Sequence, residues 1–223
     1  MTAPQAAAFL RPFFAGLRAL GADLGAADPA PQSVPYPRRR TGADDAPRSD
    51  VFASRFVPRA NLEEQDKRDA TVRAVRAAAE LGLSVRSRNF SPSLKVAGWP
   101  GSTAAVSRAF RASMMHLTVF EPAGVEAGVG GVEFAARHGV LAKGMEGIRT
   151  VTPGSGAYFN EADRLEPEWQ VSFFGEHYGR LLRVKERVDP WGLFWAPNTV
   201  GSEGWEVKTV DGLPSQNGRL CRV

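Results

Sequence analysis

Two stretches of the chain place alternate residues on two different faces and a third is an apolar run, and both patterns are typical of β-strands. In residues 51–58, Phe52 and Phe56 fall on the same face. Residues 83–90 alternate in the same way and leave one face polar, whereas residues 113–120 form a more apolar run. The sequence therefore predicts three strands over these ranges.

Apolar residues also recur at helical spacing between and around the strands. A helix is expected over residues 5–20, bent or restarted at Pro12, and a second one from an Asn61 N-cap to about Leu81. One or two helical turns are expected at residues 105–112.

Two later stretches complete the pattern of helices. Residues 122–149 stay open between two interpretations, because four glycines favour a loop and the stretch from Val132 to Leu141 favours a helix. A further helix is expected from about Glu166 to Arg187.

The order strand, helix, strand, strand, helix predicts an α+β fold, in which a largely antiparallel sheet has helices packed on one side. Residues 21–50 are rich in Gly, Ala, Asp and Pro, which is typical of a long connection. We therefore divide the chain into an N-terminal helix and linker (1–50), an α+β region (51–150) and a C-terminal segment (151–223).

Composition and charge narrow the functional classes. The 223 residues are 43% hydrophobic and carry a net charge of +4, but the basic residues are dispersed, so we expect no nucleic-acid partner. No apolar run approaches the ~20 residues of a membrane span, and no secretory signal is visible, so the default location is the cytoplasm. The single cysteine, Cys221, and three scattered histidines predict no metal site.

The most distinctive stretch of the chain runs from Pro153 to Trp205. It contains a Tyr-x-Asn sequence, an acidic run into Trp169, an amphipathic helix, an Asp-Pro stop followed by aromatic residues, and a closing Gly-Ser-Glu-x-Trp. Together these motifs resemble the C-terminal segment of the berberine-bridge-enzyme-like family of FAD-linked oxidases. Within that family the chain is most similar to fungal oxidoreductases, which often serve secondary-metabolite pathways.

The resemblance implies an α+β substrate-binding domain whose sheet covers a flavin, with the substrate between them. The implied cofactor is FAD. The implied reaction is the two-electron oxidation of an alcohol, an amine or an activated C–H or N–H centre of a small molecule, after which O2 reoxidises the flavin.

Tyr158 is the candidate catalytic residue. When a flavin takes a hydride from a carbon that bears an OH or NH, a positioned phenol can take the accompanying proton, and the resemblance gives Tyr158 this role. From the residues alone, a core aromatic with a satisfied hydroxyl is the plainer interpretation. Asn160 is implied to contact the flavin, since an amide both donates and accepts; the alternative is a turn-capping residue.

Two further residues are weaker candidates for substrate binding. His116 lies on a predicted strand, where a lone histidine is more often structural. Asn89, like its neighbour Arg88, would lie on a sheet face that either meets substrate or is solvated. The acidic residues that precede the last helix are interpreted as helix-dipole and solubility residues: Asp163, Glu166 and Glu168.

No counterpart of the family's N-terminal FAD-binding domain is recognisable upstream of Val51, and the glycines from Gly128 to Gly131 lack the spacing of a dinucleotide loop. Two hypotheses follow. In the first, the chain is a shortened oxidoreductase that works as a homodimer or with a separate FAD-binding chain. In the second, it is a flavin-free module that binds a ligand or partner.

Overall fold

The computed structural model describes residues 2–25, 51–90, 92–98, 104–121, 131–208 and 219–223. The chain divides into two compact units, Met1–Ala46 and Pro47–Val223. The second unit holds both the predicted α+β region and the predicted C-terminal segment, and the boundary between those two stays a prediction.

The described part of the first unit contains one helix, α1 (Ala3–Ala19). Thr2 caps its N-terminus: the Thr2 hydroxyl accepts from the backbone N–H of Gln5, and the Gln5 side chain accepts from the backbone N–H of Thr2. The helix continues through Pro12, so the expected restart does not occur. It ends just before Gly21, whose φ of +82° is the left-handed conformation that favours glycine.

The second unit is built on a three-stranded antiparallel sheet in the order β1-β3-β2. All three predicted strands are confirmed, as β1 (Phe52–Pro58), β2 (Ser84–Asn89) and β3 (Ser113–Phe120). In the register, Phe56 of β1 lies opposite His116 of β3.

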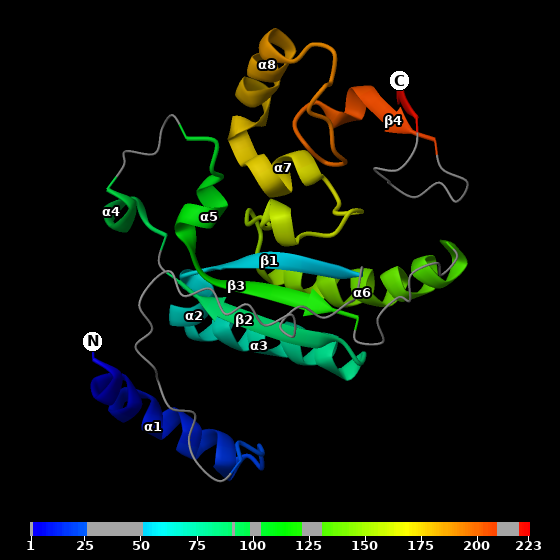
Figure 1. Ribbon diagram of the computed structural model, residues 1–223. Coiled ribbons are helices and arrows are strands. Elements are labelled where there is room, and N and C mark those ends of the chain that lie inside the picture. The colour runs from blue at the N-terminus through cyan, green and yellow to red at the C-terminus, as the bar shows by residue number, and fades with distance from the viewer. Residues whose placement is uncertain (1, 26–50, 91, 99–103, 122–130, 209–218) are drawn as a thin grey trace. The chain divides into compact units, whose positions relative to one another are not determined.

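Helices α3 (Gln65–Glu80) and α6 (Gly131–Val151) pack against each other, and the hydrophobic core lies between them and one face of the sheet (Figure 1). The core side chains of the strands alternate along the chain, whereas those of α6 recur at helical spacing. This arrangement confirms the predicted α+β fold with its antiparallel sheet. The fully buried core residues include Ala53, Val57 and Val119 of the sheet, and Leu141, Met145 and Ile148 of α6.

The first predicted helix of this unit is split in two. A short helix, α2 (Ala60–Glu63), precedes α3, and Glu64 between them has an extended backbone. Asn61 is therefore not an N-cap. Its buried amide instead donates to the Thr71 hydroxyl (2.9 Å) and to the Val151 carbonyl (2.7 Å), which ties α2 to α3 and to the end of α6.

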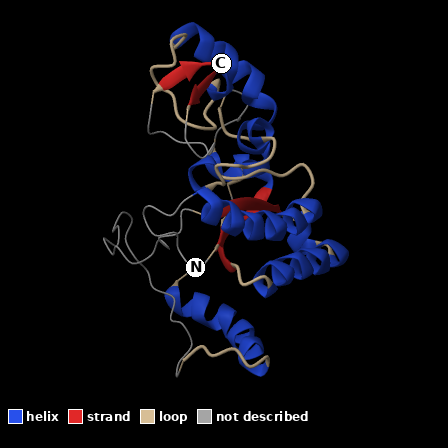
Figure 2. Cartoon of the chain, turned by 90° about the vertical axis from the view of Figure 1, so that its right-hand side faces the viewer, coloured by secondary structure: helices blue, strands red, loops and turns tan. Residues whose placement is uncertain are grey.

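The C-terminal part of the unit lies on the side of the opposite face of the sheet (Figure 2). The long helix predicted here is interrupted at Gly175, whose φ of +56° is unfavourable for other residues. The short elements of the unit are α4 (Leu94–Ala97), α5 (Arg108–Ala112), η1 (Phe159–Glu161), α7 (Trp169–Phe174), η2 (Gly175–His177), α8 (Tyr178–Val188), η3 (Ser202–Gly204), β4 (Trp205–Val207) and β5 (Leu220–Arg222).

The Asp-Pro stop after α8 is confirmed. Asp189 accepts from the backbone N–H groups of Leu193 and Phe194 and from the Lys185 side chain, and these hydrogen bonds lower its pKa. Two of the aromatic residues that follow, Trp191 and Phe194, are more than three-quarters exposed. In the part of the chain that the structure describes, no helix is long and apolar enough to cross a membrane.

Candidate functional site

The segment that carries Tyr158 is fixed along the outer edge of β1. The Phe56 N–H donates to the Gly156 carbonyl (2.8 Å), and the Ser155 hydroxyl donates to the Phe56 carbonyl (2.7 Å). The Tyr158 N–H donates to the buried Ser54 hydroxyl (3.1 Å). Three hydrogen bonds within four residues therefore position the backbone of Tyr158 relative to the sheet.

A glycine is required at position 156 by a second contact of the same segment. The Ala157 N–H donates to the Ser172 carbonyl of α7 (3.0 Å). A Cβ atom added to Gly156 would lie 2.2 Å from that carbonyl oxygen, far inside van der Waals contact. The segment is thus held between β1 and α7 at a distance that only glycine permits.

Tyr158 and Asn160 are brought together, although not by a strand. Residues Phe159–Glu161 form the 3₁₀ turn η1, and Tyr158 precedes it. The Asn160 amide nitrogen donates to the Tyr158 hydroxyl oxygen (3.0 Å). The Tyr158 side chain is 40% exposed, so its hydroxyl is not sealed in the core. The turn therefore brings the two side chains into contact.

His116 lies beside Tyr158 on the same face of the sheet. The two rings meet edge to face with centroids 5.7 Å apart, and His116 is only 5% exposed. Burial lowers the pKa of His116, Glu161 opposes this effect and Arg88 adds to it. His116 Nε2 is buried and has no hydrogen-bond partner among the described residues. A neutral imidazole nitrogen of this kind can still donate or accept one hydrogen bond, depending on the tautomer.

Glu161 and Arg88 close the polar side of this group. Arg88 Nη1 lies 2.9 Å and 3.1 Å from the two carboxylate oxygens of Glu161. Glu161 Oε2 is 3.8 Å from His116 Nδ1, which is too long for a hydrogen bond but close enough for a charge interaction. We call His116, Tyr158, Asn160, Glu161 and Arg88 the Tyr158 cluster.

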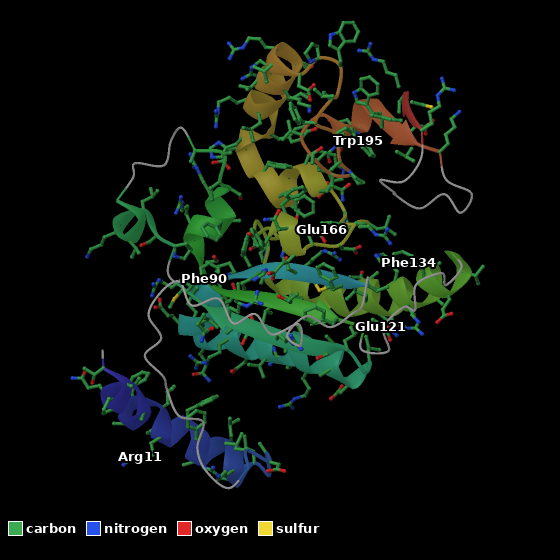
Figure 3. The ribbon with its side chains drawn as sticks, in the orientation of Figure 1. Arg11, Phe90, Glu121, Phe134, Glu166 and Trp195 are labelled. Atoms are coloured by element: carbon green, nitrogen blue, oxygen red, sulfur yellow. The ribbon has the colours of Figure 1, made fainter. Side chains whose placement is uncertain are left out.

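Aromatic rings form the apolar side of the Tyr158 cluster. Phe56 lies 5.6 Å from His116 between ring centroids, and it also contacts Phe90 and Phe110. Phe90 and Phe110 stack on each other at 5.5 Å, and Figure 3 shows Phe90 at one end of the sheet. The cluster therefore combines hydrogen-bonding groups with flat apolar surface, which is the usual composition of a small-molecule site.

The family model "Berberine and berberine like" matches residues 157–201, the stretch that contains Tyr158 and Asn160. The bifunctional decalin synthase calF of Penicillium decumbens is 32% identical over 199 residues, which are 87% of this chain and 33% of that protein. The FAD-linked oxidoreductase patO of Aspergillus clavatus is 43% identical over 76 residues, 34% of this chain and 12% of its own.

Solved structures agree with these relatives. The VAO-type flavoprotein MtVAO615 from Myceliophthora thermophila superposes with a TM-score of 0.67 and 26% identity, over 97% of this chain and 38% of that one. This chain is similar to the berberine-bridge-enzyme-like FAD-linked oxidoreductases, and the family model matches its residues 157–201. It spans about a third or less of the length of the curated relatives that it matches.

Three of the four candidate residues lie together and the fourth does not. His116, Tyr158 and Asn160 share the Tyr158 cluster. Asn89 lies opposite Met115 in the register, so its side chain alternates onto the face that α3 covers. Any role of Asn89 in substrate binding would have to come from that other face.

Two residues of the Tyr158 cluster were not chosen from the sequence. Arg88 was placed with Asn89 on a sheet face that either meets substrate or is solvated, but was not selected as a candidate, and nothing in the sequence singled out Glu161. Their pairing joins positions 73 residues apart, and no local pattern reports such a contact. The one available signal was that Arg88 alternates onto the same strand face as Arg86, away from Asn89.

The interpretation of the acidic run before α7 as helix-dipole and solubility residues is wrong for Asp163 and Glu166, whereas Glu168 is exposed. Glu166 is 4% exposed; it pairs with Arg149 at 2.6 Å and accepts from the Ser172 hydroxyl at 2.9 Å (Figure 3). Asp163 is equally buried and lies 2.7 Å from His138 Nε2. These two carboxylates bind residues of α6, and so connect the matched segment 157–201 to that helix.

Proposed function

We propose that this chain forms the substrate-facing part of an FAD-linked oxidoreductase that oxidises a small organic molecule, within secondary metabolism. The observation that carries the proposal is the Asn160 hydrogen bond to the Tyr158 hydroxyl beside the buried His116 Nε2, which has no hydrogen-bond partner in the described part of the chain. The named activities of the relatives support it, because they include a decalin synthase and several FAD-linked oxidoreductases.

The proposed chemistry assigns proton handling to the protein. When bound, FAD supplies the hydride acceptor and passes the electrons to O2. Tyr158 acts from its deprotonated form, whose phenolate oxygen takes the proton that leaves the substrate hydroxyl or amine. The Asn160 N–H that already points at this oxygen would stabilise the negative charge of the phenolate before the proton arrives.

The residues of the Tyr158 cluster fit the ring portion of such a cofactor and its substrate. A buried nitrogen without a partner costs free energy, and a polar edge of the ring or the substrate would supply the partner that His116 lacks among the described residues. Asn160 and Tyr158 would face the flavin ring, and Phe56, Phe90 and their neighbours would line the apolar wall. None of the described residues is proposed to bind the cofactor's pyrophosphate.

An oxidase assay with two matched tyrosine variants tests the proposal. The chain is supplied with FAD, and hydrogen peroxide release is followed over a panel of small alcohols and amines. Tyr158→Phe should lower turnover about 100-fold or more, because it removes the proton acceptor. Tyr178→Phe is the control, since the Tyr178 hydroxyl bonds Glu203 and its pKa is raised, chiefly by burial.

Two results would count against the proposal. Equal turnover by Tyr158→Phe and the unaltered chain would remove Tyr158 from the reaction. Absence of any flavin-dependent turnover would favour the flavin-free module that binds a ligand or a partner.

A further inference from the structure

His116 lies at the centre of a row of three side chains that crosses the sheet. Phe56 of β1 and Arg88 of β2 both lie opposite His116 of β3 in the strand register. Directly opposed residues of antiparallel strands share a face of the sheet, with Cβ atoms about 4.5–5.5 Å apart. The row therefore places an aromatic ring on one side of the imidazole and a guanidinium on the other.

Glu161 of η1 connects two members of this row. Its carboxylate accepts from Arg88 Nη1 at 2.9 Å and 3.1 Å, and its Oε2 lies 3.8 Å from His116 Nδ1. The Glu161 backbone N–H donates to the Tyr158 carbonyl (2.9 Å), and Asn160 precedes Glu161 in the same turn. One ion pair therefore ties β2 to the turn that carries Asn160, and it does so beside the imidazole.

Two charges act on the imidazole of His116, from Glu161 of η1 and from Arg88 of β2. β3 has no other charged residue between Ser113 and Phe120, and the arginine of β1 alternates onto the opposite face of the sheet. Arg111 of α5 donates to a backbone carbonyl. Glu161 favours the protonated imidazole, whereas burial and Arg88 favour the neutral one.

The position of Glu161 also favours one tautomer of His116. A neutral imidazole carries a single N–H, and a carboxylate beside one ring nitrogen favours the proton on that nitrogen. We therefore expect the proton of His116 on Nδ1, which faces Glu161, and the lone pair on Nε2, which is then an acceptor. Because Arg88 balances the charge of the carboxylate, this arrangement does not draw a second proton onto the ring.

We propose that Arg88 and Glu161 are positioning residues of the Tyr158 cluster: their ion pair fixes the turn that carries Asn160 and keeps His116 neutral, with its proton on Nδ1. A group that meets His116 Nε2 must then donate a hydrogen bond, as a hydroxyl or an N–H does and a carbonyl does not. This preference for an alcohol or an amine rests on the proposed oxidoreductase function, whereas the state of the imidazole does not.

Nuclear magnetic resonance of the full chain without flavin tests the proposal. The ring signals of His116 are identified by their Overhauser contacts to the rings of Tyr158 and Phe56, and they are followed as the pH is varied. The nitrogen shifts of the neutral ring should place the proton on Nδ1. Arg88→Gln leaves the carboxylate unbalanced and should raise the midpoint of the His116 titration by at least about half a pH unit, whereas Glu161→Gln should lower it.

Two variants separate this effect from a general loss of arginine. Arg88→Lys keeps the positive charge and should return the midpoint to that of the unaltered chain. Arg86→Gln is the matched control, because Arg86 lies on the same face of β2, opposite Thr118, and is not among the charges that act on His116. It should leave the midpoint unchanged.

Hydrogen exchange measures the other half of the proposal. The Glu161 amide is protected by its hydrogen bond within the turn, so its exchange should become about two- to fivefold faster in Arg88→Gln, as expected for the loss of an exposed ion pair. Arg86→Gln should leave this rate unchanged.

Four results would overturn the proposal. These are equal titrations of Arg88→Gln and Arg86→Gln, a midpoint raised by Glu161→Gln, a neutral ring with its proton on Nε2, and an unchanged exchange rate at Glu161 in Arg88→Gln. Midpoints that move as expected in a chain without flavin-dependent turnover would contradict the proposed oxidoreductase function alone. Turnover with midpoints that do not move would contradict this inference alone.

Discussion

Replacing Gly156 by alanine tests how the Tyr158 segment is held between β1 and α7. The new Cβ would lie 2.2 Å from the Ser172 carbonyl oxygen, so the segment or α7 must move by about 1 Å to restore ordinary contact. Overpacking of this kind costs about 1–3 kcal/mol. The movement also stretches the buried hydrogen bond from the Ala157 N–H to the same oxygen, so we expect a loss of about 2–4 kcal/mol in the free energy of unfolding.

Gly139→Ala is the matched control for this change. Gly139 lies inside α6, and an added Cβ there meets nothing within 4 Å. The same substitution should therefore stabilise the chain by about 0.5–1 kcal/mol, because alanine loses less backbone entropy in a helix. Guanidinium unfolding followed by far-UV circular dichroism measures both variants. If Gly156→Ala unfolded at the same denaturant concentration as the unaltered chain, the close approach between the segment and α7 would be refuted.

Two further predictions concern buried charge. Glu166→Gln leaves Arg149 without its buried carboxylate and should lower the free energy of unfolding by about 3 kcal/mol. Glu63→Gln disrupts the exposed pair with Arg59 and should lower it by less than ~0.5 kcal/mol; equal effects in chemical unfolding would mean that the first pair is not buried in solution. The pKa of His116 in the folded chain lies below its ordinary value of 6.5, so as the pH falls the imidazole takes up its proton in the unfolded chain first. The free energy of unfolding should therefore fall as the pH drops below about 6.5, until the pKa of the folded chain is passed. The slope from this one group is at most about 1.4 kcal/mol per pH unit, and an unchanged slope in His116→Phe would exclude it as the cause.

The strands were predictable because period-two alternation is written locally in the sequence. The long helix α6 was predicted only as one of two alternatives, over Val132 to Leu141, because glycines inside it lower its helix propensity. Gly144 shows how packing uses one of them: an added Cβ would lie 2.4 Å from Leu83 Cδ1, so the Leu83 side chain occupies the space that a larger residue would need. Tertiary packing therefore overrode the local signal.

The candidate site likewise has a part that the sequence predicted locally and a part that depends on distant contacts. Tyr158 and Asn160 are two residues apart, and their motif in the sequence was enough to select both. The contacts that complete the site join distant positions, such as Arg88 with Glu161 and Arg149 with Glu166. The acidic run could not reveal that Glu166 is buried, because its arginine partner lies 17 residues away on another helix.

The measurement that tests the central claim most directly is the visible absorbance spectrum of the purified chain, before and after incubation with excess FAD and separation from free cofactor. The account predicts retained flavin bands, reduced in Asn160→Leu and unchanged in Asn198→Leu, because Asn198 bonds the Arg164 carbonyl, outside the Tyr158 cluster. A colourless protein that never retains FAD would contradict the claim that these residues act on a flavin in this chain.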